Sequence, residues 1–288
     1  MTTLELARFA LYADLGVAFG VPVAALLTRV AMESVRPIIT GAVLIGLPLS
    51  LVAFLLTIAQ MAGTDLADLD WQLAGEVTKS TSVGWAFLAR MGALGLAAAF
   101  RLTNPRRSGW QLALAAIAMG SLAWSGHAAA GEGSLVFPRL GADIVHQLSA
   151  SVWLGAILLF LAQLRTGSNV PHESVEALKR FAGVGSVLVA LLALTGLANL
   201  WFLIPLNNWR DVLSTSYGEL LAVKLGLFFS MLLLAALNRF VMVPGLASGS
   251  RTERAQFRLR VSIALELCAI VAILAIVARL GMMDPTSG

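Results

Sequence analysis

Charged residues are scarce in this chain of 288 residues: they make up 12% of it, whereas soluble globular domains have about 25%. Together with 58% hydrophobic residues and a mean hydropathy of +0.85, this scarcity excludes a soluble enzyme, and we expect no enzymatic turnover. Cysteine is almost absent as well. The single Cys268 excludes a disulfide scaffold and any cysteine-rich zinc or iron–sulfur module.

Clusters of positive charge are also missing, although the net charge is +4 and the pI is about 9.8. The Lys and Arg residues stand one to three at a time between apolar runs. Proteins that bind nucleic acid gather such residues into a patch or stripe, so we expect no nucleic acid partner. Short basic loops between apolar runs are typical of a polytopic membrane protein, whose surroundings are lipid.

Long apolar runs are what the chain has in abundance. A membrane-spanning helix needs about 20 mostly apolar residues, and the runs predict an all-α bundle of about eight transmembrane helices. The short connections leave no room for a second folded unit, so we predict a single integral membrane domain over residues 1–288. The predicted spans are residues 5–29, 38–62, 82–102, 109–128, 140–164, 179–204, 217–242 and 258–281.

The distribution of basic residues predicts the orientation of the bundle. Most of the 20 Lys and Arg residues fall in or beside the loops that follow the first, third, fifth and seventh predicted spans. Loops rich in basic residues stay in the cytoplasm. We therefore predict that these loops are cytoplasmic and that both termini lie on the opposite side of the membrane.

Several ionisable residues fall inside the predicted spans. An ionised side chain there costs at least about 2.5–3.5 kcal/mol, so each needs a partner or a function. Asp14, Arg90 and Lys224 are predicted to lie in the outer half of the bilayer, with Glu219 about one turn above Lys224. They form either structural ion pairs or part of a functional site, and the expected partners of Lys224 are Glu219 and Asp14. Glu266 lies nearer the cytoplasmic bases, and we expect a structural role for it.

Two of the three histidines stand at the outer ends of neighbouring predicted spans. His127 and His146 flank one short loop, and Asp143 precedes His146 by three residues, which places both on one helical face. Imidazole suits copper, zinc, iron and nickel, and a nearby carboxylate, Asp143 or Glu132, can ligate the metal or orient a ring. A metal site, a haem site, a proton relay and plain interfacial residues all remain open. His172 is expected to be a solvated residue of a cytoplasmic loop.

Other side chains near this face have two interpretations each. Trp153, two turns inward from His146, is either an apolar wall or the floor of a site. Met282 and Met283 follow the last span and are either soft metal ligands or the end of a fraying helix. Met119 is expected to serve packing.

Six segments of the second half of the chain, each built around one or a few polar residues, follow in a fixed order: Ser125-Gly126-His127, Asp143 to Gly155, Phe181 leading to Thr195-Gly196 and Asn199, Tyr217-Gly218-Glu219 to Lys224, Leu237-Asn238-Arg239-Phe240, and Leu259-Arg260 to Glu266. In the second segment, Trp153 follows His146 by seven residues. This order and spacing resemble the copper resistance D (CopD/PcoD-like) membrane protein family, over about residues 115–281.

The resemblance implies a multi-pass protein of the bacterial inner membrane that takes part in copper transport or relay. In such a membrane the N- and C-termini, which the basic residues place opposite the cytoplasm, are periplasmic. It also implies a periplasmic copper-binding partner of the CopC type. In this interpretation His127 and His146, with Asp143, bind a copper ion at the periplasmic mouth of the bundle. The chain has no ladder of Met or Cys along a helix, which favours a capture site over a complete conduit.

Two alternatives stay open at this point. His127 and His146 could be the axial ligands of one haem b in a membrane cytochrome, since paired imidazoles between helices are a common haem ligation. The protein could also be an assembly factor that delivers copper to an oxidase without moving it across the bilayer.

Overall fold

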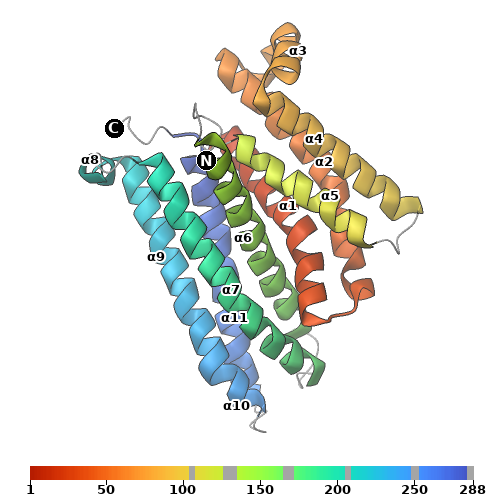
Figure 1. Ribbon diagram of the computed structural model, residues 1–288, viewed down its shortest axis with the longest axis vertical. Helices are drawn as coiled ribbons and strands as arrows, with labels where there is room; N and C mark the ends of the chain where they lie inside the picture. The colour runs from red at the N-terminus through yellow and green to blue at the C-terminus, as the bar shows by residue number, and fades with distance from the viewer. Residues whose placement is uncertain (104–107, 126–134, 165–171, 205–208, 248–252, 284–288) are drawn as a thin grey trace.

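The computed structural model describes residues 1–103, 108–125, 135–164, 172–204, 209–247 and 253–283, and in these ranges it is helical with no strand. Long helices run side by side in a bundle (Figure 1). The elements are α1 (Thr3–Thr28), α2 (Met32–Ala62), η1 (Leu66–Asp68), α3 (Trp71–Ser80), α4 (Ser82–Thr103), α5 (Ser108–Gly120), η2 (Ser121–Ser125), α6 (Val136–Leu164), α7 (His172–Leu203), α8 (Trp209–Leu213), α9 (Ser216–Leu237), the π-helix η4 (Asn238–Met242), α10 (Val243–Ala247) and α11 (Glu253–Leu280).

The number of membrane spans nearly matches the prediction. Within the described ranges, seven helices are long and apolar enough to cross a membrane, and the apolar stretch Gly109–Trp124 is shorter. This stretch was predicted as the fourth span. Because the 3₁₀ segment η2 extends α5 at about 2 Å per residue, the two together reach about 30 Å, the thickness of the hydrocarbon core. Both termini lie at the same end of the bundle (Figure 1), as an even number of crossings requires.

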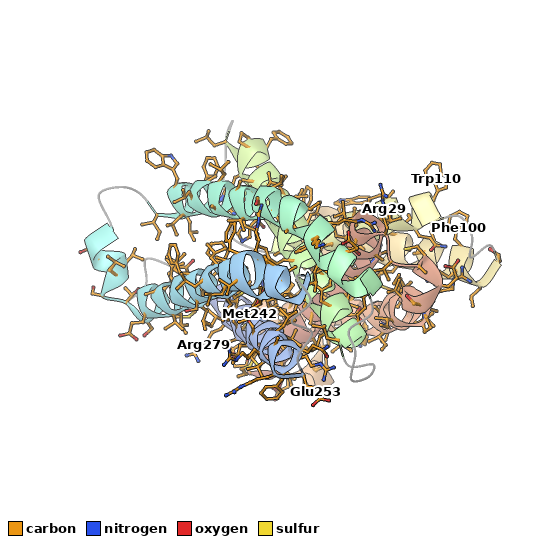
Figure 2. The ribbon with its side chains drawn as sticks, turned by 90° about the horizontal axis from the view of Figure 1, so that it is seen from below. Arg29, Phe100, Trp110, Met242, Glu253 and Arg279 are labelled. Carbon is orange, nitrogen blue, oxygen red and sulfur yellow. The ribbon has the colours of Figure 1, made fainter. Side chains whose placement is uncertain are left out.

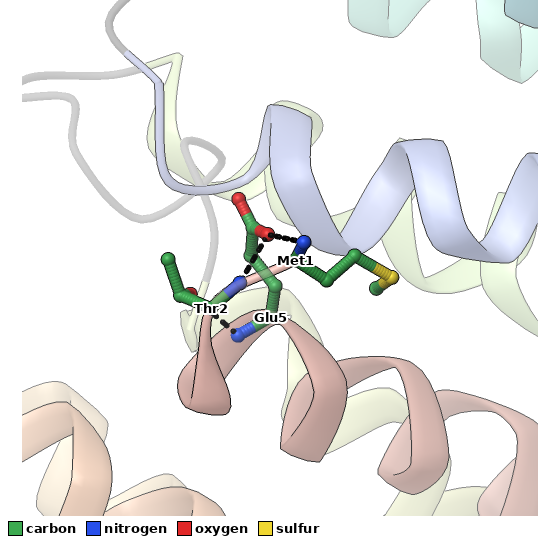
Figure 3. Close-up of polar contacts among 3 residues, drawn as sticks. All are labelled: Met1, Thr2 and Glu5. Carbon is green, nitrogen blue, oxygen red and sulfur yellow. Dashed lines mark hydrogen bonds and ion pairs between the residues drawn. The ribbon is translucent and has the colours of Figure 1, made fainter.

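The first helix begins at a reciprocal cap. The backbone N–H of Glu5 donates to Thr2 Oγ1 over 3.2 Å, and the backbone N–H of Thr2 donates to Glu5 Oε2 over 2.7 Å (Figure 3). The terminal ammonium of Met1 lies 3.8 Å from the same carboxylate oxygen. This capping box satisfies backbone donors that the first turn leaves free, so α1 starts at a defined residue.

The tightest helix crossing joins α1 to α6. A Cβ atom added at Gly20 would lie 1.7 Å from the carbonyl oxygen of Ser151, and one added at Gly155 would lie 2.1 Å from the carbonyl carbon of Gly20. Only glycine fits on both sides of this crossing. Close backbone approach at small residues is the usual way in which helices associate in a membrane, and here it places α6 against the centre of the bundle.

Apolar side chains cover the outside of the bundle. Trp110 is 67% exposed and points away from the edge near α4 and α5 when the bundle is viewed along its length (Figure 2). Leu194 on α7 and Phe229 on α9 are exposed to a similar degree. Such a surface suits contact with lipid chains, and it leaves the polar side chains described below as the exceptions inside.

Candidate functional site

Helix α6 presents three polar side chains on one face in its first half. Asp143, His146 and Gln147 are three and four positions apart, so they lie on the same side of the helix. All three are half-buried, and their partners come from α7 and α9. We call this group and its partners the α6 cluster: Asp143, His146, Gln147, Thr195, Asn199 and Lys224.

The imidazole of His146 is held by α7. Its Nδ1 atom lies 3.0 Å from the Oγ1 atom of Thr195, and that hydroxyl donates its own proton to the carbonyl of Leu191 over 2.5 Å. A Thr195 hydroxyl that donates to Leu191 can only accept from His146, because a hydroxyl has a single proton. In that arrangement the proton of the neutral ring is on Nδ1 and a lone pair remains on Nε2. The ring also lies against Gly196, where an added Cβ atom would be 3.6 Å from Cε1.

The carboxylate of Asp143 is held by two amides. Gln147 Nε2 donates to its Oδ2 over 2.8 Å, and Asn199 Nδ2 of α7 donates to its Oδ1 over 3.4 Å. Lys224 of α9 and Arg139 of α6 interact with it electrostatically. The carboxylate therefore has a fixed orientation and nearby positive charge from two helices.

His146 lies deeper than the sequence predicts. The fifth span was expected to begin at residue 140, with His146 near its outer end, but α6 begins at Val136. His146 follows by ten residues, which corresponds to about 15 Å along the helix. Pro138 stands in the first turn of α6. A proline is tolerated there, because the N–H groups of the first turn have no acceptor within the helix, so α6 can begin before Pro138. The α6 cluster is thus inside the bundle rather than at its rim.

The predicted partners of Lys224 are wrong. Glu219 precedes Lys224 by five positions, which turns it about 140° away on α9, and its side chain is exposed. Asp14 faces α2, where a Cβ atom at Gly46 would lie 2.7 Å from its Oδ2, and that oxygen is buried with no hydrogen-bond partner. Lys224 interacts instead with Asp143 and His146.

Arg90 belongs to the packing of the first helices. Its side chain is 3% exposed, its Nη1 donates to Ser121 Oγ over 3.4 Å, and it interacts electrostatically with Tyr12. Among the residues that the structure describes, neither Arg90 nor Asp14 contacts the α6 cluster. The ionisable residues of the spans therefore do not form one group.

Residues deeper in the bundle and at its end have separate surroundings. Trp153 is 4% exposed, and its indole N–H faces Glu266 rather than His146. Met283 packs against an apolar cluster around Tyr217, and Met282 lies beside it in the chain, half-buried. Met119 is in the main apolar core, as expected.

Two predicted site residues, His127 and Glu132, lie outside the described residues. Within the described ranges, no group of three or more His, Cys, Asp or Glu side chains could hold a metal ion. The described part of the candidate site thus supplies one imidazole and one carboxylate, and further ligands have to come from another part of the chain.

The residues that orient these two groups were not predicted as site residues. Thr195 and Asn199 are four positions apart on α7, and this spacing of two polar residues in an apolar helix was the available signal. Gln147 stands four positions after Asp143 and gave the same kind of signal.

Comparisons with known proteins give one consistent result. Residues 1–137 match the family described as copper resistance protein D-like, N-terminal domain, and residues 175–280 match the family described as copper resistance protein D. The chain is 36% identical over 300 residues to copper resistance protein D of Pseudomonas syringae pv. tomato, covering 96% of this chain and 95% of that protein. The match therefore includes the first helices, beyond the residues 115–281 that the motifs indicated.

Two further relatives cover less of the chain. Copper transport protein CutJ of Bacillus subtilis (strain 168) is 31% identical over 144 residues, which are 49% of this chain and 26% of that protein. Inner membrane protein YebZ of Escherichia coli (strain K12) is 31% identical over 125 residues, 43% of this chain and 42% of that protein. No solved structure matches.

Proposed function

Because this chain belongs to the copper resistance protein D family and is a multi-pass protein of the bacterial inner membrane, we propose that it binds copper at the α6 cluster and relays it. Copper stands in the names of two of the relatives, copper resistance protein D and copper transport protein CutJ. The finer assignment, a copper site around His146, rests on the geometry of the cluster, and access to it from the periplasm is part of the proposal.

The observation that carries this assignment is the contact of His146 Nδ1 with the hydroxyl of Thr195. Histidines that bind metals almost always donate their other ring N–H to a protein acceptor, which orients the ring. In the proposed site Nδ1 donates to Thr195, and the Nε2 lone pair is the one that binds the metal. Asp143, three residues earlier and held by two amides, is the accompanying carboxylate.

Lys224 tunes this site. A copper ion at His146 has to share the negative charge of Asp143 with Lys224 and Arg139, which weakens its binding. A relay needs binding strong enough for the ion to enter and weak enough for it to leave. The cluster therefore suits transfer of copper better than storage.

The remaining ligands and the side of entry are part of the proposal. We assign His127 as the second imidazole and Glu132 as a candidate third group. By the distribution of basic residues, the end of the bundle where both termini lie faces the periplasm, so a CopC-type copper-binding protein would deliver copper there.

Copper binding by the purified full chain in detergent tests the site, with equilibrium dialysis as the measurement. We expect His146→Ala and His127→Ala each to remove tight copper binding. His172→Ala is the matched control and should bind copper like the wild type. Undiminished affinity in both His146→Ala and His127→Ala would overturn the assignment.

The two alternative functions give different results in simple measurements. A haem b between His127 and His146 would give a visible absorption spectrum of the purified protein, which copper alone would not. A copper-delivery assembly factor would bind copper but show no copper flux in vesicles. Copper flux without a haem spectrum supports the proposed relay.

A further inference from the structure

A second polar group lies deeper in the bundle, away from the contacts of the α6 cluster. Glu266 of α11 is 2% exposed, Ser262 one turn before it 3%, Asn238 at the start of η4 8%, and Trp153 of α6 4%. These four side chains come from three segments of the chain. The copper site proposed above uses none of them as a ligand.

The hydrogen bonds of this group are incomplete. Asn238 Nδ2 donates to Glu266 Oε1 over 2.6 Å, and the indole N–H of Trp153 faces the same carboxyl group. The Oδ1 atom of Asn238 and the Oγ atom of Ser262 are buried without a hydrogen-bond partner. Buried polar atoms are nearly always paired, so an unpaired amide oxygen beside a carboxyl group calls for a donor.

No positive charge balances Glu266 among the residues that the structure describes. Its carboxyl group accepts a hydrogen bond from Asn238 and lies near the indole N–H of Trp153, and both side chains are neutral. Charged side chains on the helices packed against α11 have their contacts elsewhere. On α1, Glu5 contacts Thr2, Arg8 contacts Tyr12, and Asp14 lies beside Gly46. On the other helices, Arg239 contacts Ser186, Glu219 is exposed, and the remaining charged side chains belong to the α6 cluster or lie beside it: Arg139, Asp143, His146 and Lys224.

An ionised carboxylate in these surroundings is costly, because Glu266 is buried and no cationic side chain among the described residues compensates its charge. The group must therefore hold either a metal ion or a proton. Its nearby atoms are oxygens and N–H donors, with no imidazole or thioether among the partners found, and copper prefers the latter two. A proton suits the site better, because a protonated carboxyl group can donate to Asn238 Oδ1 while Asn238 Nδ2 donates to Glu266 Oε1.

The backbone supports a functional role for this place. Val243 N–H donates to the carbonyl of Asn238, five residues earlier, which makes η4 a π-helix. Single π-turns within helices are rare and occur often at functional sites. Here the π-helix begins at the residue that binds Glu266.

We propose that Glu266 is a proton-binding site of the bundle, and that it releases its proton when a copper(I) ion enters, so that the total charge within the membrane stays the same. In this step the O–H bond of the carboxyl group breaks, the electron pair stays on the carboxylate, and the proton passes to water. The coupling to copper rests on the function proposed above, but the protonated state of Glu266 does not.

Infrared spectroscopy of the full chain in lipid nanodiscs tests the protonated state. The wild type minus Glu266→Gln difference spectrum should contain a carboxylic acid C=O band that shifts in D₂O. The control Glu76→Gln, at an exposed carboxylate of α3, should give no such band. A difference spectrum with carboxylate bands and no carboxylic acid C=O band would overturn the proposal.

Proteoliposomes with an internal pH dye test the coupling, with copper(I) kept reduced by ascorbate and copper(II) in parallel. The wild type and Glu76→Gln should move protons when copper is added. Glu266→Gln should lose this proton movement while it still binds copper in equilibrium dialysis, which also shows that it is folded. Glu266→Asp, which keeps an acidic group, should retain part of the proton movement.

The two proposals fail in different ways in this experiment. If the wild type takes up copper and Glu266→Gln moves protons equally well, the coupling is wrong and the copper function stands. If the wild type takes up no copper, the relay fails, and the infrared difference still decides whether Glu266 carries a proton.

Discussion

Arg90 in the first half of the bundle and Asp143 in the second are both ionisable side chains inside membrane-spanning helices, but their surroundings differ. Arg90 has one long hydrogen bond, to Ser121, and a buried Nε atom with no partner. Asp143 has a hydrogen bond to each carboxylate oxygen and two positive groups nearby. The comparison teaches that burial of a charge alone does not mark a candidate site, and that a connected set of partners is what distinguishes Asp143 from Arg90.

The largest effect is expected from Lys224→Met, because it leaves Asp143 with less positive charge around it in the membrane. Removal of one partner of a buried charge pair costs about 3–5 kcal/mol, and we expect the lower end of this range for the free energy of unfolding in mixed micelles. The double variant with Asp143→Asn should recover most of the loss, and Lys79→Met on the exposed side of α3 should have no effect. A double variant as unstable as Lys224→Met would show that the two residues are not coupled.

The next effect concerns the crossing that joins the two halves. Gly20→Ala places a methyl group where the carbonyl of Ser151 already lies, so α1 and α6 must move apart. Overpacking of this kind costs about 1–3 kcal/mol in the free energy of unfolding. Gly92→Ala, where an added Cβ meets nothing within 4 Å, is the control and should be neutral or slightly stabilising. Equal stability of both variants would contradict the close crossing.

A smaller effect is expected on copper affinity from Thr195→Val. Valine has nearly the shape of threonine but cannot accept the proton of His146 Nδ1, so the ring loses its fixed orientation. Loss of such an orienting partner lowers metal affinity about 10–100-fold. Thr57→Val, which removes a similar hydroxyl bonded to the carbonyl of Ala53, should bind copper normally in the same dialysis measurement. Unchanged affinity in Thr195→Val would remove the support for His146 as a ligand.

The smallest effect is expected from Arg90→Met. The variant removes a buried charge that no carboxylate of the described residues pairs with, so it also removes the desolvation cost, and the two changes nearly cancel. We expect stability within about 1 kcal/mol of the wild type and normal copper binding. A loss of copper binding in this variant would break the distinction between the two halves.

The sequence was sufficient for the bundle and for part of the site. Apolar runs predicted the spans, and the three-residue spacing of Asp143 and His146 predicted their shared face. The depth of His146 was missed because the fifth span was predicted to begin at residue 140, whereas α6 begins at Val136 and includes Pro138 in its first turn. The partner of Lys224 was missed because pairing depends on how α6 and α9 are turned toward each other, which spacing within α9 does not contain.

Other features were out of reach of the sequence for a related reason. Thr195 in an apolar helix is indistinguishable from a hydroxyl that only bonds its own backbone, as Thr57 does, until α6 is seen beside it. Glu266 was expected to have its charge neutralised by the basic residues on the cytoplasmic side of the bundle. Its partners are instead Asn238 and Trp153, which the topology brings from two other helices.

The crossing of α1 and α6 also has a consequence for biogenesis. About 135 residues separate Gly20 from Gly155, and ribosomes add about 5–20 residues per second. The first helix therefore resides in the membrane for on the order of ten seconds before its closest neighbour has been synthesised. During that interval α2 and then α5 are the partners of α1 that have been synthesised, so these helices have to hold α1 in lipid while its glycine face stays available.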